Sequence, residues 1–113
     1  MDERRLSKVA RLIQKELAEL FRQDTQANAK GVIISVTTVR PTADLSLCRV
    51  FLSIFPSSQA QDLLKSIQEN KSKIRGDLGR RLHGQLRIIP DLAFFIDDSL
   101  DYIEHIDQLL HKK

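Results

Sequence analysis

Apolar residues near the start of the chain recur at the spacing of an α-helix. Within LSKVARLIQKELAELFR they follow the i, i+3, i+4, i+7 pattern, which at about 100° per residue gathers them on one face. They are Leu6, Val9, Ala10, Ile13, Leu17, Leu20 and Phe21. The opposite face carries a row of basic residues, namely Arg4, Lys8, Arg11, Lys15 and Arg22. The pattern predicts an amphipathic helix whose basic outer row is either a solvated surface or a binding surface.

Two stretches rich in β-branched and apolar residues then predict a pair of strands. The first runs from Val32 to Val39, and the second, LSLCRVFLSIF, alternates apolar residues with Arg49 and Ser53. The five residues RPTAD join them, so we expect an antiparallel hairpin with one buried face. That face would carry Cys48, Val50, Leu52 and Ile54, and the helices are the elements available to cover it.

A second helical pattern follows Pro56 and contains an interruption. Ser58 and Gln61 match a capping box at its start. Asn70 and Lys71 stand where the apolar stripe requires apolar residues, so the pattern predicts a kink or division near residues 70 to 72. The stripe itself consists of Ala60, Leu64 and Ile67, and it resumes in phase at Ile74, Leu78 and Leu82. Two helices meeting at a bend are therefore expected.

Gly76 and Gly79 lie on the polar side of the second half of this pattern. A glycine inside a helix costs about 1 kcal/mol relative to alanine, so a bare backbone is expected to serve some contact there. Two interpretations remain open: the approach of an RNA phosphate or sugar, and close packing against a neighbouring helix. The letters GDLG also match the GxxG loop of KH domains. Asp77 is unsuited to a phosphate clamp and Leu78 belongs to the apolar stripe, so a helix is favoured.

The last part of the chain predicts one more strand and one more helix. Gly84 suits a helix C-terminus, and Leu92 to Ile96, LAFFI, reads as a third short strand. The stretch DDSLDYIEHIDQLLHKK predicts a helix capped by Asp98 or Ser99. Its apolar face consists of Leu100, Ile103, Ile106 and Leu110. The adjacent carboxylates of Asp97 and Asp98 lack an accompanying histidine, metal-ligand set or nucleophile, so capping is favoured over catalysis.

Composition narrows the class of protein without identifying an activity. The 113 residues, 42% hydrophobic and 29% charged, fit one ordinary globular domain rather than a disordered chain. No apolar run approaches the roughly 20 residues that span a bilayer, and the charged start is not followed by the apolar block of a signal peptide. We therefore expect a cytoplasmic protein with no membrane partner. The lone Cys48 and the scattered His83, His105 and His111 lack ligand spacing, so no metal or other cofactor is expected.

The charge of the chain is unevenly distributed. Residues 1 to 87 hold 16 Lys and Arg residues against 9 Asp and Glu residues, a net +7. Residues 88 to 113 hold 2 against 6, a net −4, which together with the first part gives the +3 of the whole chain. A basic body of this kind is typical of proteins with a polyanionic partner.

The predicted order of elements and four sequence stretches together resemble a known family. The stretches are RLSKVARLIQKELAEL, DLSLCRVFLSIF, IRGDLGRRL and LRIIPDLAFFIDDSLDY, the last with the pattern R-x-x-P-x-L-x-F-x-x-D-x-S. They resemble the bacterial ribosome-binding factor A family over nearly the whole chain. The resemblance implies an α+β, type II KH-like domain over residues 1 to 113, with a three-stranded sheet and helices packed on one face. It also implies an interrupted helix pair bent at a triplet that aligns with Asn70, Lys71 and Ser72.

The resemblance further implies a non-enzymatic assembly factor. Such a protein would bind the immature small (30S) ribosomal subunit and its 16S rRNA, and would support late maturation and 5′-end processing of the rRNA. We expect a monomer with no small-molecule substrate. The residues expected to contact RNA are Lys71, Lys73, Arg75, Arg80, Arg81 and Arg87, supported by Arg4, Lys8, Arg11 and Lys15. Two alternatives remain: a protein-binding adaptor of the ribosome-assembly or translation machinery that uses an exposed sheet edge, and an enzyme that uses Asp97 and Asp98.

Overall fold

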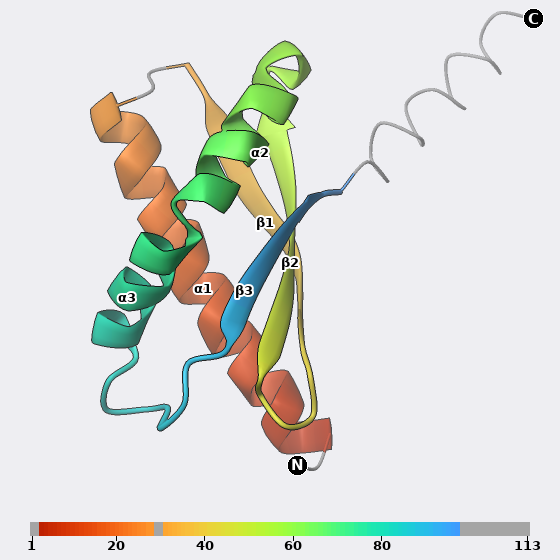
Figure 1. Cartoon of the computed structure of the whole chain (residues 1–113), viewed down its shortest axis with the longest axis vertical. Helices are drawn as coiled ribbons and strands as arrows, with labels where there is room; N and C mark the ends of the chain where they lie inside the picture. The colour runs from red at the N-terminus through yellow and green to blue at the C-terminus, as the bar shows by residue number, and fades with distance from the viewer. Residues whose placement is uncertain (1–2, 29–30, 98–113) are drawn as a thin grey trace, which may run out of the picture.

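The computed structural model describes residues 3–28 and 31–97. Its elements are helix α1 (Glu3–Asn28), strands β1 (Ile33–Pro41) and β2 (Leu47–Phe55), a 3-10 turn η1 (Ser57–Gln59), helices α2 (Ala60–Glu69) and α3 (Lys71–Arg81), and strand β3 (Asp91–Ile96). Figure 1 shows the three α-helices together on one side of the sheet. The predicted α+β fold and its order of elements are confirmed as far as residue 97. The predicted C-terminal helix, with its Asp98 or Ser99 cap, lies outside the described residues.

The sheet has the order β1-β2-β3 and is mixed. Strand β1 pairs with β2 antiparallel, as the hairpin prediction requires, and β3 pairs with β2 parallel. The predicted inward positions of β2 are all buried, from Cys48 at 0% exposure to Ile54 at 7%. The hairpin is therefore confirmed with the predicted face toward the helices. A shift in register between Val36 and Thr38 keeps Val39 on the buried face as well.

The core lies between this face and the helices. Ile13 and Leu17 of α1 and Leu78 of α3 are fully buried. The rings of Phe21 on α1 and Phe94 on β3 meet edge to face, with centroids 6.0 Å apart. Packing of this kind fixes α1 and α3 in place by burying the apolar stripes read from the sequence.

The helical region after β2 is interrupted at Asn70, within the predicted range. Asn70 has φ −102° and ψ 14°, which ends α2, and α3 begins at the next residue. The Asn70 side-chain amide donates a 2.8 Å hydrogen bond to the carbonyl of Ser66, so the side chain completes the last turn of α2. The capping box predicted from Ser58 and Gln61 is wrong. The chain instead enters α2 through η1, and neither element has a side-chain cap.

The Asp44 carboxylate accepts several of the hydrogen bonds that hold the loop between β1 and β2. Asp44 accepts hydrogen bonds from the Thr42 hydroxyl and from the hydroxyl and backbone N–H of Ser46, at 2.8 to 3.1 Å. These bonds, first the one from the Ser46 N–H, lower the pKa of Asp44 to about 2. The next residue, Leu45, adopts a left-handed φ of 58° and buries its side chain in the core. The loop thereby closes one end of the core.

Candidate nucleic-acid interface

The basic row of α1 is exposed, as its position opposite the apolar face requires. Arg4, Lys8, Arg11 and Lys15 are all exposed, and none of these side chains forms a salt bridge with another described residue. Arg22, at the end of the row, pairs instead with Glu19, and the Arg22 guanidinium lowers the pKa of that carboxyl. The free part of the row therefore covers the first half of α1.

Lys71, Lys73 and Arg87 are likewise exposed and form no salt bridge within residues 3–28 and 31–97. Lys71 and Lys73 lie in the first turn of α3, next to the interruption at Asn70. Lys73 is also at the rim of a cavity of about 330 Å³ between α1, β1 and the two helices. Asp24 and Asp77 share that rim, so the cavity is of mixed charge and less suited to phosphate than the open helix surface.

Arg75 is occupied by the chain itself. Its guanidinium donates hydrogen bonds to the carbonyls of Ile89, at 2.7 Å, and Pro90, at 3.3 Å, and it lies 3.4 Å from the carboxylate of Asp91. These residues lead into β3, so Arg75 joins α3 to the start of that strand. The contact spans 14 to 15 positions in sequence, and no local pattern could have shown it.

Arg80 and Arg81 have different surroundings although they are neighbours. Arg80 pairs with Asp77 one turn earlier, and its side chain is 73% exposed. Arg81 is only 28% exposed and donates a 2.6 Å hydrogen bond to Gln23 of α1, with Glu16 of α1 at 3.7 Å. An exposed ion pair of this type is weak, so Arg80 remains available at the surface for another anion. Arg81 connects α3 to α1.

The two glycines of α3 are not required by packing within the described fold. A methyl group added at Gly76 would meet only the Arg80 guanidinium, at 3.8 Å. One added at Gly79 would meet Ile89 at 3.5 Å, an ordinary van der Waals contact. Neither residue has the left-handed φ that favours glycine. The interpretation as close helix packing is therefore not supported by the contacts of Gly76. The helix favoured over a GxxG loop is confirmed, because these residues form a continuous part of α3 with Leu78 buried.

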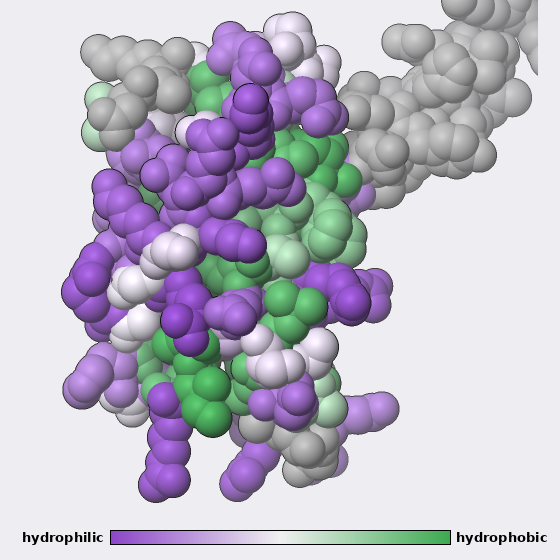
Figure 2. Space-filling view, viewed as in Figure 1, coloured by the Kyte–Doolittle hydropathy of each residue, from purple (hydrophilic) through white to green (hydrophobic). Residues whose placement is uncertain are grey.

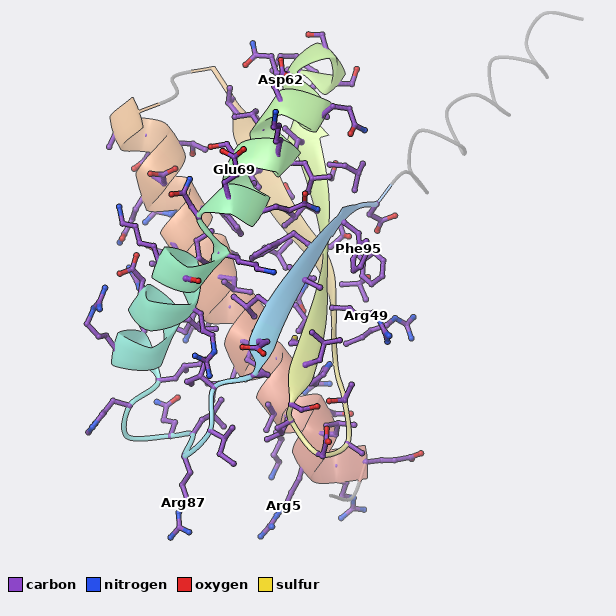
Figure 3. The ribbon with its side chains drawn as sticks, viewed as in Figure 1. Arg5, Arg49, Asp62, Glu69, Arg87 and Phe95 are labelled. Carbon is purple, nitrogen blue, oxygen red and sulfur yellow. The ribbon has the colours of Figure 1, made fainter. Side chains whose placement is uncertain are left out.

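One basic residue of α1 outside the predicted set, Arg5, lies on the same flank of that helix as Gln23. Arg5 and Gln23 are 18 positions apart, about five helical turns, so they share one flank of α1. That flank is the one that Arg81 contacts. Figure 3 shows Arg5 and Arg87 projecting from the same end of the molecule. The spacing of Arg5 and Gln23 in the sequence shows that they share a flank of α1. Only the structure shows that this flank faces α3.

The predicted site residues therefore all belong to the helix side of the molecule or to the loop after α3. Figure 2 shows hydrophilic side chains over most of the helix side, with hydrophobic surface where β3 lies. Arg49 is exposed on the opposite face of the sheet, and Figure 3 shows it pointing away from the helices beside Phe95. The basic surface is thus confined to one side, except for Arg49 of β2 and its exposed cross-strand partner Arg40 of β1.

The structure also places the groups that the sequence offered for metal binding and catalysis. Within residues 3–28 and 31–97, no group of three or more His, Cys, Asp or Glu residues could hold a metal ion. The carboxylate of Asp97 accepts a 2.5 Å hydrogen bond from the hydroxyl of Thr37. Burial raises the pKa of the Cys48 thiol to about 12, which keeps it protonated and unreactive. In the same part of the chain, no helix is both long enough and apolar enough to cross a membrane.

Comparison with known proteins gives a consistent result. The model of the family described as ribosome-binding factor A matches residues 5–110. Ribosome-binding factor A of Flavobacterium psychrophilum is 44% identical over 114 aligned positions, which cover 100% of this chain and 88% of that protein.

Two structures of ribosome-binding factor A from Thermus thermophilus share the fold. The crystal structure has a TM-score of 0.64 at 20% identity, covering 80% of this chain and 94% of that one. A homology model fitted into a cryo-EM map of a complex between that protein and the 30S subunit has a TM-score of 0.57 at 21% identity, covering 77% and 93%. At these identities the likeness concerns the fold alone.

Proposed function

The chain belongs to the ribosome-binding factor A family, and from this membership we propose that it binds the small ribosomal subunit through 16S rRNA and supports its late maturation. The proposal includes support of 5′-end processing of the rRNA. The protein would act in the cytoplasm as a single-domain monomer, by binding rather than by catalysis. The relative from Thermus thermophilus, which shares the fold, has been fitted into a 30S complex.

The observation that carries this proposal is the set of exposed cations without an acidic partner in the described chain. They are Arg4, Lys8, Arg11 and Lys15 on α1, Lys71 and Lys73 on α3, and Arg87 in the following loop. Each cation that replaces a counterion at a phosphate adds to affinity without reading the base sequence. The mechanism is therefore electrostatic docking combined with recognition of rRNA shape.

The remaining predicted contacts divide by their surroundings. Arg80 can exchange Asp77 for a phosphate, because its own side chain is 73% exposed and an ion pair open to solvent is weak. Arg75 and Arg81 hold β3 and α1 in position, and in our proposal they support the RNA surface chiefly by fixing α3.

The adaptor alternative requires a free sheet edge, and it is less well supported because both edges of this sheet are partly occupied. Both edge strands already use a backbone carbonyl to bind a helix side chain. The amide of Gln14 donates to the Val36 carbonyl of β1 at 3.0 Å, and that of Gln68 donates to the Phe94 carbonyl of β3 at 3.1 Å. A partner strand would compete with these bonds.

Quantitative co-sedimentation tests the proposed function. The full chain should bind immature small ribosomal subunits saturably and large subunits at least tenfold more weakly. Chemical footprinting on the bound subunit should then show 16S rRNA protections that are lost when Lys71 and Lys73 are both changed to Glu. Equal binding to both subunits, or protein crosslinks without any rRNA protection, would contradict the proposal and favour the adaptor.

A further inference from the structure

One exposed apolar side chain lies next to a cation of the proposed RNA-binding set. In the described part of the chain, four large hydrophobic side chains are exposed, and Ile33, Phe55 and Phe95 belong to the three strands. The fourth, Ile88, is 58% exposed and follows Arg87 in the loop between α3 and β3. A single exposed apolar residue is common on protein surfaces, so its setting decides what it means.

The loop is anchored on both sides of this exposed pair. Before it, the backbone N–H groups of Gln85 and Leu86 both donate to the Leu82 carbonyl, at 2.9 and 3.0 Å. The Leu86 side chain packs against the core. After the pair, Ile89 also packs against the core, and Pro90 is fully buried. The pair is therefore held between two buried attachment points.

Helix α3 and the sheet hold the second attachment point in place. Arg75 donates a 2.7 Å hydrogen bond to the Ile89 carbonyl. One turn further along α3, the side chain of Ile89 lies 3.5 Å from the position that a Cβ on Gly79 would take. The backbone N–H of Asp91 donates a 3.1 Å hydrogen bond to the Ser46 carbonyl. A loop fixed in this way loses little conformational entropy when it binds a partner.

The charge around the pair favours a polyanionic partner. The sequence from residue 78 to residue 90 contains three arginines and no Asp or Glu. Arg87 forms no salt bridge with another described residue, and Figure 3 shows it at the same end of the molecule as Arg5. The isoleucine beside it requires a partner with an apolar surface close to a phosphate. In rRNA, the unstacked bases of loops and bulges offer such a surface next to the backbone.

From these observations we propose that Arg87 and Ile88 together bind an unpaired nucleotide of 16S rRNA. The Arg87 guanidinium contacts the phosphate, and the Ile88 side chain packs against the face of the base. Stacking hides the base faces of a regular helix, so this contact distinguishes unpaired from helical rRNA without reading the identity of the base. The inference rests on the proposed function and adds to it the class of rRNA element that the loop recognises.

Two substitutions in the full chain separate the two contacts. Ile88→Ala should weaken binding to immature small ribosomal subunits about five- to tenfold without changing the salt dependence, because an apolar contact releases no counterions. Arg87→Gln should weaken binding and flatten the slope of log affinity against log salt by about 0.7. The matched control Ile33→Ala removes an isoleucine of similar exposure, 60%, from β1 and should bind as the wild type does.

Photocrosslinking identifies the surface that Ile88 contacts. With Ile88 replaced by the photoreactive residue p-benzoylphenylalanine, irradiation of the complex with the immature small subunit should join the chain to unpaired nucleotides of 16S rRNA. Three results would overturn the proposal: crosslinks to ribosomal proteins alone, crosslinks to base-paired rRNA alone, and the absence of any crosslink.

Failure of this inference is distinguishable from failure of the proposed function. If Ile88→Ala binds as tightly as the wild type, or if Ile33→Ala loses as much affinity, the contact with an unpaired base is contradicted. Preferential binding of the wild type to small subunits would then leave the proposed function standing. Equal binding of the wild type to small and large subunits would contradict the proposed function itself, and this inference with it.

Discussion

Gly76 shows how a single residue on α3 distinguishes a structural from a binding role. An alanine there meets only the flexible Arg80 side chain, at 3.8 Å, so nothing in the described fold needs the glycine. Gly76→Ala should therefore raise the free energy of unfolding by about 1 kcal/mol, because alanine is the better helix former. Chemical denaturation measures this. An unchanged or lower stability would contradict it, and weaker rRNA binding by the more stable variant would identify the bare backbone as a contact surface.

Asp44 gives the protein a defined acid sensitivity. Its pKa in the folded chain is about 2, below the ordinary value of 3.8, so its bonds to Thr42 and Ser46 stabilise the fold while it is ionised. The stabilisation is complete above about pH 4 and is lost as the pH falls toward about 2. Thermal unfolding of the wild type and Asp44→Asn should therefore differ at neutral pH and converge on acidification. A constant difference across this range would show that the charge is not responsible.

Residue-scale prediction from sequence succeeded where the cause was local. The alternation of β2 correctly placed Cys48 and Val50 inside and Arg49 outside, since side chains of a strand alternate between faces. The left-handed backbone of Leu45 had no such signal, because it arises from closing the hairpin loop over the core.

At the scale of elements, Arg81 is the connection between α3 and α1. Arg81→Ala removes a 2.6 Å hydrogen bond to Gln23 and the nearby charge of Glu16, so we expect a loss of about 1 kcal/mol in stability. The neighbouring Arg80→Ala is the control and should change stability by less than about 0.5 kcal/mol, because its pair with Asp77 is exposed. Denaturant unfolding measures the free energy of unfolding of both variants and of the wild type. Equal losses would show that Arg81 does not join the helices.

The elements themselves were largely predictable, and their relations were not. Periods of 3.6 and 2 residues in the apolar pattern located the helices and strands, and the polar residue Asn70 located the interruption. The parallel pairing of β3 with β2 depends on a connection across the helix pair, which no local pattern contains. The capping box failed because a 3-10 turn after Pro56 takes the place of a capped helix start.

At the scale of the whole molecule, charge and apolar surface are separated between two faces. The helix side carries the exposed cations apart from Arg40 and Arg49, and the outer face of the sheet carries Ile33, Phe55 and Phe95. The sequence predicted the basic row of α1, because the positions of side chains around a single helix follow from their spacing in its sequence. It could not show that Arg75 and Arg81 are engaged with Ile89 and Gln23, because those contacts join distant parts of the chain.

The salt dependence of binding to immature small ribosomal subunits tests the central claim most directly. If about five phosphates are neutralised, the logarithm of affinity should fall with the logarithm of salt concentration with a slope of about −3.5 to −4.5. Charge reversal at two exposed positions of α1, Lys8→Glu with Arg11→Glu, should weaken binding and flatten that slope by about 1.5. Arg49→Glu, on the opposite face of the sheet, should leave both unchanged. An unaltered affinity and slope in a correctly folded Lys8→Glu and Arg11→Glu variant would contradict the account.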